Sequence, residues 1–132
     1  MAMTSIFSKI VAGEIPAYKV YEDENFLAFL DVFPIAAGHT LVIPKKEIDN
    51  VFDLDDELYL KYQLVCKKIA KALAISISCV RVGSAVVGLE IPHAHIHLVP
   101  LNSIGDLNFE KPKLKFSEEE FRHMVQLIKS NL

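Results

Sequence analysis

The residues best suited to chemistry are three histidines, His93, His95 and His97, which alternate with apolar residues between Pro92 and Pro100. Alternation with a period of two is typical of a strand, because successive side chains of a strand point to opposite faces of the sheet. We therefore predict a strand from Pro92 to Pro100, with the imidazole rings about 6.6 Å apart on one exposed face. Packing does not require such a row of rings, so the stretch predicts a functional site.

Three interpretations of this row remain open. The first is a solvated stripe of histidines without a function. The second is a zinc site, since His-x-His is a common ligand arrangement, although the outer rings of a regular strand lie about 13 Å apart. The third is phosphoryl chemistry, in which an imidazole attacks phosphorus, donates a proton or binds phosphate oxygens. The pattern favours the third, and His39, at the start of another predicted strand, is a candidate fourth member.

The composition narrows the class of protein. The chain has 132 residues, a net charge of −3 and 52% apolar residues, which predicts one globular domain over residues 1–132. The acidic balance argues against a nucleic-acid partner, and no apolar run approaches the roughly 20 residues of a membrane helix. Cys66 and Cys79 lack Cys-x-x-Cys spacing, and the N-terminus lacks the pattern of a signal peptide. We therefore expect reduced thiols and a cytoplasmic protein.

The elements that must position the histidines follow from hydrophobic periodicity and capping residues. Strands are predicted at residues 17–21, 26–30, 39–43 and 78–82, in addition to the histidine strand. Helices are predicted after Thr4 or Ser5 to Ile10, from Asp53–Asp56 to about Ala74, and after the capping box of Ser117 and Glu120. This order predicts an α+β fold with an antiparallel sheet. Leu60 and Leu64 lie on the lysine-bearing side of the long helix, which predicts a contact with another chain.

These segments resemble the histidine-triad (HIT) family of nucleotide hydrolases and transferases. The resemblance rests on His93-Ala-His95-Ile-His97-Leu-Val, on Ile6 to Pro16 with Tyr21-Glu-Asp23, on Phe26 to Asp31, and on Gly38 to Lys45. It covers residues 4–100 and leaves residues 101–132 as a variable C-terminal extension with a helix. It implies a HIT-like antiparallel sheet with one long helix and short N-terminal and C-terminal helices, assembled as a homodimer.

The resemblance also implies a role for each candidate residue. His95 would attack the α-phosphorus and carry the nucleotidyl group, while His93 and His97 would bind the phosphate and assist the leaving group, and His39 would orient the cluster. The base and ribose of a purine nucleotide would lie near Phe7, Phe29 and Asp31, and the phosphate near Gly88 and Leu89. The reaction would be hydrolysis of a nucleoside phosphoramidate or a dinucleoside polyphosphate, with no metal and no cofactor.

Two departures from the family pattern affect these expectations. Leu89 and Glu90 stand where relatives have glutamine and a small hydroxyl residue, so a nucleotide-binding adaptor with weak turnover remains an alternative, as does a zinc-dependent hydrolase. Strand parity predicts that Glu90 faces away from the histidines. Some relatives hold a structural zinc on a Cys-x-x-Cys and a histidine; Ser5, Ser8 and Glu47 occupy those positions here, which predicts no structural zinc.

Overall fold

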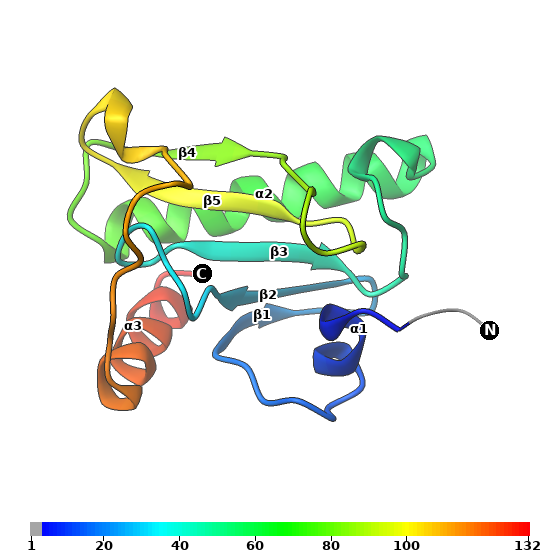
Figure 1. Cartoon of the computed structure of the whole chain (residues 1–132), viewed down its shortest axis with the longest axis horizontal. Helices are drawn as coiled ribbons and strands as arrows, with labels where there is room; N and C mark the ends of the chain where they lie inside the picture. The colour runs from blue at the N-terminus through cyan, green and yellow to red at the C-terminus, as the bar shows by residue number, and fades with distance from the viewer. Residues whose placement is uncertain (1–3) are drawn as a thin grey trace.

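The computed structural model describes residues 4–132, so the first three residues of the predicted domain lie outside the described range. The core is a five-stranded antiparallel sheet with the strand order β1-β2-β3-β5-β4 (Figure 1). The elements follow in the order α1 (Ile6–Val11), β1 (Lys19–Glu22), β2 (Phe26–Leu30), β3 (Thr40–Pro44), the 3-10 turn η1 (Val51–Asp53), α2 (Asp56–Ser76), β4 (Arg81–Ala85), β5 (Ile96–Leu101), the 3-10 turn η2 (Ile104–Asp106) and α3 (Glu118–Ser130). The predicted α+β class, with one long helix and short terminal helices, is confirmed.

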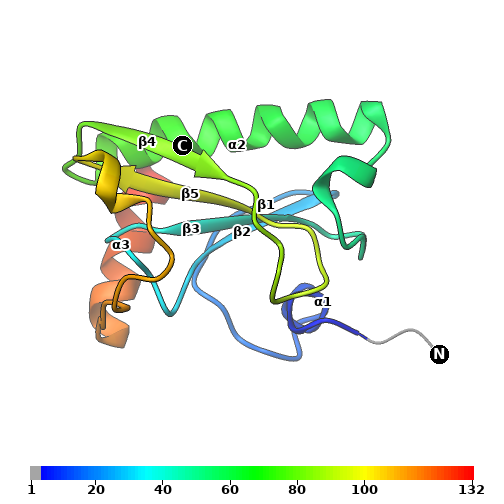
Figure 2. The ribbon, with the colours of Figure 1, turned by 45° about the horizontal axis from the view of Figure 1, so that its top comes forward.

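Helices cover both faces of the sheet, as the turned view makes plain (Figure 2). Phe26, Ala28 and Leu30 of β2 belong to the larger apolar core, which α2 and α3 close. The residues between them, Leu27 and Phe29, point to the opposite face and pack in a second cluster with α1. All five residues of β2 are buried for this reason, which explains its continuous apolar sequence.

Capping side chains set the helix boundaries. The side chain of Asp55 accepts a hydrogen bond from Leu58 N–H at the start of α2, and Ser5 does the same for Ser8 N–H at the start of α1. Ser117 and Glu120 form the predicted capping box of α3. Within the described residues, none of the helices is long and apolar enough to cross a membrane.

The prediction of a histidine strand from Pro92 to Pro100 is wrong at its beginning. β5 starts only at Ile96, because the chain turns before it: His93 N–H donates to Ile91 O at 2.8 Å and Ala94 N–H donates to Ile48 O at 2.6 Å. Neither bond belongs to the sheet ladder. The parity argument for Glu90 required a regular strand and does not hold. The predicted strand at residues 78–82 is likewise displaced, to Arg81–Ala85.

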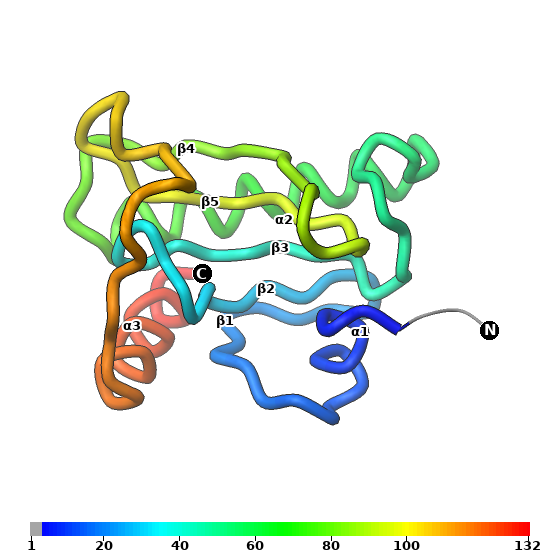
Figure 3. Tube along the Cα trace, in the orientation of Figure 1, coloured from blue at the N-terminus to red at the C-terminus, as the bar shows by residue number. Residues whose placement is uncertain are grey.

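The residues between η2 and α3 cross the end of the sheet. This connecting segment, residues 107–117, runs from the tip beyond β5 past the start of β3 to α3, and the Cα trace shows its path without regular structure (Figure 3). Leu114 N–H donates to Pro34 O at 2.8 Å, which ties the segment to the loop that precedes β3. The sequence placed this segment in a variable extension with a helix, and its position beside the histidines was not predicted.

Candidate active site

The four candidate histidines gather on the face of the sheet that α1 covers. His97 lies on β5, opposite Leu41 of β3 and Ala85 of β4. His39 immediately precedes β3, whereas His93 and His95 lie in the turn before β5. Their exposed fractions are 1% for His39, 0% for His93, 7% for His95 and 8% for His97. The predicted exposed row of parallel rings is therefore wrong: all four rings are buried, and the His97 ring lies beside the rings of both His39 and His95.

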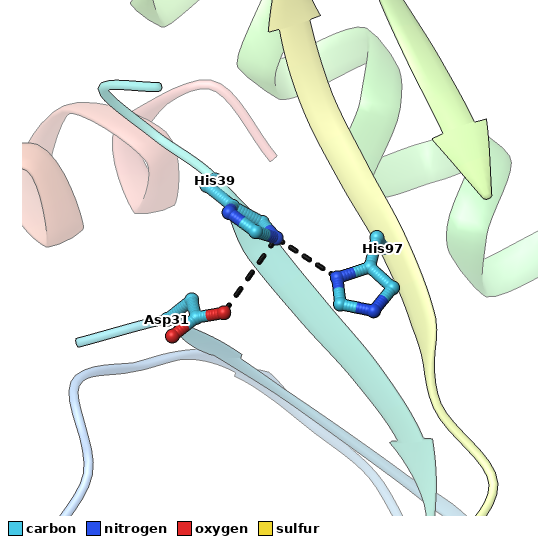
Figure 4. Close-up of side chains that lie close together, drawn as sticks. All are labelled: Asp31, His39 and His97. Atoms are coloured by element: carbon cyan, nitrogen blue, oxygen red, sulfur yellow. Dashed lines mark hydrogen bonds and ion pairs between the residues drawn. The ribbon is translucent and has the colours of Figure 1, made fainter. Parts of the chain in front are cut away.

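His39 and His97 form a hydrogen-bonded pair beside Asp31 (Figure 4). His39 Nδ1 accepts a hydrogen bond from Ile35 N–H at 3.2 Å, so the ring hydrogen of neutral His39 is on Nε2. His39 Nε2–H lies 2.9 Å from His97 Nδ1 and 3.7 Å from an Asp31 carboxylate oxygen. His97 Nδ1 is therefore the acceptor, and the hydrogen of His97 is on Nε2. This leaves His97 with a nitrogen that donates.

His95 has the opposite arrangement. Its Nδ1 lies 2.7 Å from the backbone carbonyl oxygen of His93, which only accepts hydrogen bonds. Nδ1 therefore carries the hydrogen, and Nε2 keeps its lone pair. Phe7 of α1 stands nearly perpendicular to the ring, with 5.1 Å between the ring centroids. A backbone acceptor and an aromatic edge thus hold His95 with a nucleophilic nitrogen.

His93 has both ring nitrogens engaged within the protein. Nε2 donates to Pro44 O at 2.8 Å, and Nδ1 accepts from the hydroxyl of Ser5 at 2.8 Å. With the ring fully buried, these bonds occupy the atoms that a phosphate would need. The ring therefore has no free nitrogen for the expected phosphate contact, and the atom of His93 that faces His95 is its carbonyl oxygen.

Burial keeps the rings of His39, His93 and His97 neutral. Desolvation and, to a smaller extent, the nearby Lys113 cation lower the pKa of His39 to about 4. The pKa of His97 falls to about 3, first through desolvation and then through His39 and His95. Desolvation also lowers the pKa of His93. At neutral pH these three rings are therefore uncharged, which the hydrogen-bond pattern of the cluster requires.

Asp31, His39 and His97 also place three possible metal-ligating atoms within 4.8 Å of one another. A metal at His39 Nε2 requires the lone pair of that nitrogen, but the hydrogen bond from Ile35 N–H to Nδ1 puts the hydrogen there. A metal on Nε2 would move the ring hydrogen to Nδ1. His39 Nδ1–H would then point at Ile35 N–H, and neither group could accept the hydrogen of the other. The residues present fit a hydrogen-bonded pair better than a metal centre.

The five residues predicted to contact the nucleotide occupy different surroundings. Asp31 accepts a hydrogen bond from Phe33 N–H at 2.9 Å and is also close to His39, so it is both a turn residue and a neighbour of the cluster. Phe7 and Phe29 are buried, with ring centroids 5.5 Å apart. Gly88 has a positive φ of 66°, and the side chain of Leu89 is 88% exposed. The structure brings Phe7 and Asp31 to the histidines and leaves the Leu89 side chain in solvent.

Sequence reasoning missed two residues of the connecting segment. The ring of Phe109 lies against His97, with 4.5 Å between centroids, and 6.1 Å from the His39 ring. The Lys113 ammonium group donates to Phe109 O, and its charge acts on both His39 and His97. Residues 101–132 were treated as a variable extension, and the alternation of Lys111, Lys113 and Lys115 gave no indication of which lysine approaches the site.

Comparison with known proteins finds matches over most of the chain. The model of the HIT domain matches residues 12–104. An uncharacterized HIT-like protein of Borreliella burgdorferi is 38% identical over 135 residues, which cover 96% of this chain and 97% of the relative.

Two further relatives are informative about chemistry. An adenosine 5'-monophosphoramidase of Schizosaccharomyces pombe is 33% identical over 132 residues, covering 98% of this chain and 99% of the relative. The crystal structure of a zinc-bound histidine triad family protein from Mycobacterium smegmatis has a TM-score of 0.79 and 30% identity, and the match covers 98% of this chain and 93% of that one.

Proposed function

Because the chain belongs to the HIT domain family, we propose that it is a nucleotide-binding hydrolase that acts at the α-phosphate of purine nucleoside phosphoramidates or related nucleotidyl substrates. The observation that carries this proposal is the tautomer of His95. The hydrogen bond from its Nδ1–H to His93 O leaves the Nε2 lone pair free to attack. The similarity to an adenosine 5'-monophosphoramidase supports the choice of substrate.

In the first step, Nε2 of His95 forms a bond to the α-phosphorus and the bond to the leaving group breaks. The leaving amine requires a proton. A bound anionic phosphate favours the protonated form of a neighbouring imidazole, which opposes the effect of burial on the pKa of His97. We assign this proton transfer to the charged form of His97, whose Nε2–H gives its proton to the leaving amine. The second hydrogen of the charged ring is on Nδ1, so His39 Nε2–H then donates to the Asp31 carboxylate, 3.7 Å away, in place of His97 Nδ1.

In the second step, water attacks the nucleotidyl-histidine, the P–N bond breaks and the nucleoside monophosphate is released. His97 takes the proton of this water, so the ring returns to its starting state. Asp31, close to His39 and at the start of the loop before β3, is the proposed acceptor for the ribose hydroxyls. The backbone at Gly88 and Leu89 is the proposed contact for the phosphate. No step requires a metal ion.

The test is to incubate the protein with adenosine and guanosine 5'-phosphoramidates and with dinucleoside polyphosphates. ³¹P NMR measures the release of nucleotide from each compound. We expect hydrolysis of at least one phosphoramidate in the presence of EDTA. His95→Ala is expected to lower kcat by at least ~10³-fold, as for loss of a covalent nucleophile, while AMP binding persists. The matched control is His123→Ala, which removes an exposed histidine of α3.

The result also separates the alternatives. Wild-type protein that binds AMP but hydrolyses none of these compounds would be a nucleotide-binding adaptor, and the proposal would fail. Activity that EDTA abolishes would indicate a metal-dependent hydrolase. Near-normal turnover by His95→Ala would reject the covalent mechanism.

We also propose that the protein is a cytoplasmic homodimer. Leu60 and Leu64 of α2 are 63% and 66% exposed, although both are large apolar side chains one turn apart. Cys66 and Cys79 are both free thiols, which suits a reducing compartment.

A further inference from the structure

Four polar groups from three parts of the chain meet where α1 begins. The hydroxyl oxygens of Ser5 and Ser8 lie 2.8 Å and 3.3 Å from His93 Nδ1. Glu47, which follows β3, accepts hydrogen bonds from Ser5 N–H at 2.5 Å and from the Ser8 hydroxyl at 2.8 Å. We call Ser5, Ser8 and Glu47 the serine–glutamate cluster. It connects α1 to the end of β3 and to the buried ring of His93.

The direction of each hydrogen bond in the cluster follows from the donors present. Pro44 O only accepts, so His93 Nε2 donates to it and His93 Nδ1 accepts. The Ser8 hydroxyl gives its one hydrogen to Glu47, and the Ser5 hydroxyl gives its hydrogen to His93 Nδ1. Ser8 N–H then donates to the Ser5 oxygen at 3.0 Å. Every group therefore has a partner without an added ion.

These groups do not form a suitable zinc site. Structural zinc is bound by thiolates and imidazoles, whereas this cluster offers two hydroxyls and one carboxylate beside a single imidazole. The lone pair of His93 Nδ1 already accepts the Ser5 hydrogen. A related protein of Mycobacterium smegmatis is zinc-bound, but the donor set in this chain fits a hydrogen-bonded network.

The network reaches the reactive histidine through one backbone atom. His93 O accepts the hydrogen bond from His95 Nδ1–H at 2.7 Å, and that bond leaves His95 Nε2 unprotonated. The orientation of His93 O depends on the orientation of the His93 residue, which the bonds to Ser5 and Pro44 fix at its two ring nitrogens. Loss of one of these bonds would let His93 O move and weaken its hydrogen bond with His95, although the residue that was changed does not contact the substrate.

We propose that the serine–glutamate cluster is a metal-free positioning network that fixes His93 and, through the His93 carbonyl oxygen, the tautomer and direction of His95. This inference rests on the proposed function for its kinetic consequence. The residues of the network are positioning residues, since none of them touches the reacting atoms. In this network, hydrogen bonds and not a metal ion fix the orientation of the His93 ring.

The variant that separates positioning from stability is Ser5→Gly. Glycine is nearly as good as serine at a helix N-cap, so α1 keeps its start while His93 loses its hydrogen-bond donor. Ser5→Thr retains the hydroxyl. Ser117→Gly makes the same cap change on α3, away from the cluster, and is the matched control.

The first measurement is independent of activity. We expect the His95 Nδ1–H proton to be protected from exchange in NMR spectra of the wild type, Ser5→Thr and Ser117→Gly, and to exchange at least ten times faster in Ser5→Gly. Unchanged exchange in Ser5→Gly would overturn the network. Stoichiometric binding of added Zn²⁺ that shifts the His93 nitrogen signals would also overturn it.

The second measurement uses steady-state kinetics with an adenosine 5'-phosphoramidate. Ser5→Gly is expected to lower kcat at least tenfold with KM changed less than twofold, and Ser5→Thr to restore most of kcat. A lower Tm with unchanged kcat would reject the positioning role. If the wild type hydrolyses nothing, the proposed function fails, while the exchange measurement still decides whether the network holds His95.

Discussion

The neighbours of each histidine decide which of its ring nitrogens carries the hydrogen. A backbone carbonyl does this for His95, a backbone amide for His39, and His39 in turn does it for His97. The result is one ring with a free lone pair beside another with a donating N–H. The rings that we propose as acid and nucleophile therefore lie side by side, with 5.0 Å between their centroids.

The fall in turnover that follows substitution of His97 is expected to depend strongly on the leaving group of the substrate. In His97→Gln the side chain still forms hydrogen bonds but cannot transfer a proton. Turnover of a phosphoramidate, whose amine must leave protonated, is expected to fall about 10²–10⁴-fold. Turnover of the p-nitrophenyl ester of AMP, whose phenolate leaves unprotonated, is expected to fall less than ~10-fold. Equal losses on the two substrates would exclude His97 as the acid.

At the scale of residues, the sequence identified the histidines but not their partners. Alternation marked His93, His95 and His97, the start of another predicted strand marked His39, and the resemblance added Asp31. Tautomers depend on atoms brought from far along the chain, such as Pro44 O at His93, and no local pattern encodes such contacts. Phe109 gave no signal because an aromatic residue in an irregular segment is indistinguishable from ordinary packing.

At the scale of elements, regular periodicity was predictable and the departure at the site was not. β2 has the predicted bounds, and α2 and α3 begin beside their predicted capping residues. The period-two pattern before Ile96 resembles a strand, yet the hydrogen bonds of His93 and Ala94 go to Ile91 and Ile48 outside the ladder. Tertiary contacts override the local pattern here, and the turn brings His95 close to His97.

The connecting segment supplies a wall of the site through Phe109. In Phe109→Ala, water reaches the His97 ring, so less desolvation remains and the pKa of His97 is expected to rise. NMR titration of the His97 ring measures this change. The free energy of unfolding is expected to fall by about 1–2 kcal/mol, since Phe109 is only partly buried.

Phe52→Ala is the control, because Phe52 is a largely exposed phenylalanine of η1. It is expected to leave the His97 titration unchanged. An unchanged pKa of His97 in Phe109→Ala would show that the segment does not shield the site.

At the scale of the molecule, the buried neutral histidines make the free energy of unfolding decrease as the pH is lowered. His39 has a pKa of about 4 in the folded protein and about 6.5 when unfolded. Between these values the unfolded state binds the extra proton, so stability is full above about pH 6.5 and falls as the pH is lowered. His39 alone contributes up to about 3 kcal/mol of this loss by pH 4.

Urea unfolding at several pH values measures the effect. In the wild type, the free energy of unfolding is expected to decrease from pH 7 to pH 4.5. His39→Leu is expected to reduce the slope by about 1 kcal/mol per pH unit between pH 5.5 and pH 4.5. A slope that this substitution leaves unchanged would contradict the buried, neutral state of His39.

The assembly of the molecule is testable through α2. Leu60→Lys with Leu64→Glu places two charges on an exposed apolar pair that we propose to lie between two subunits. The wild type is expected to be a dimer by light scattering at micromolar concentration, and the double variant to dissociate at higher concentration. The exposed pair Ile75 and Val80, changed in the same way, is the control. A monomeric wild type would contradict the proposed homodimer.

The covalent intermediate provides the most direct test of the proposed chemistry. Wild-type protein is mixed with an adenosine 5'-phosphoramidate, quenched without acid during the first turnover, and examined by intact-protein and peptide mass spectrometry. We expect one adenylyl group on His95, lost after brief acid treatment and absent from His95→Ala. Turnover that proceeds with no adduct, or with the adduct on His93 or His97, would contradict the assignment of His95 as the nucleophile.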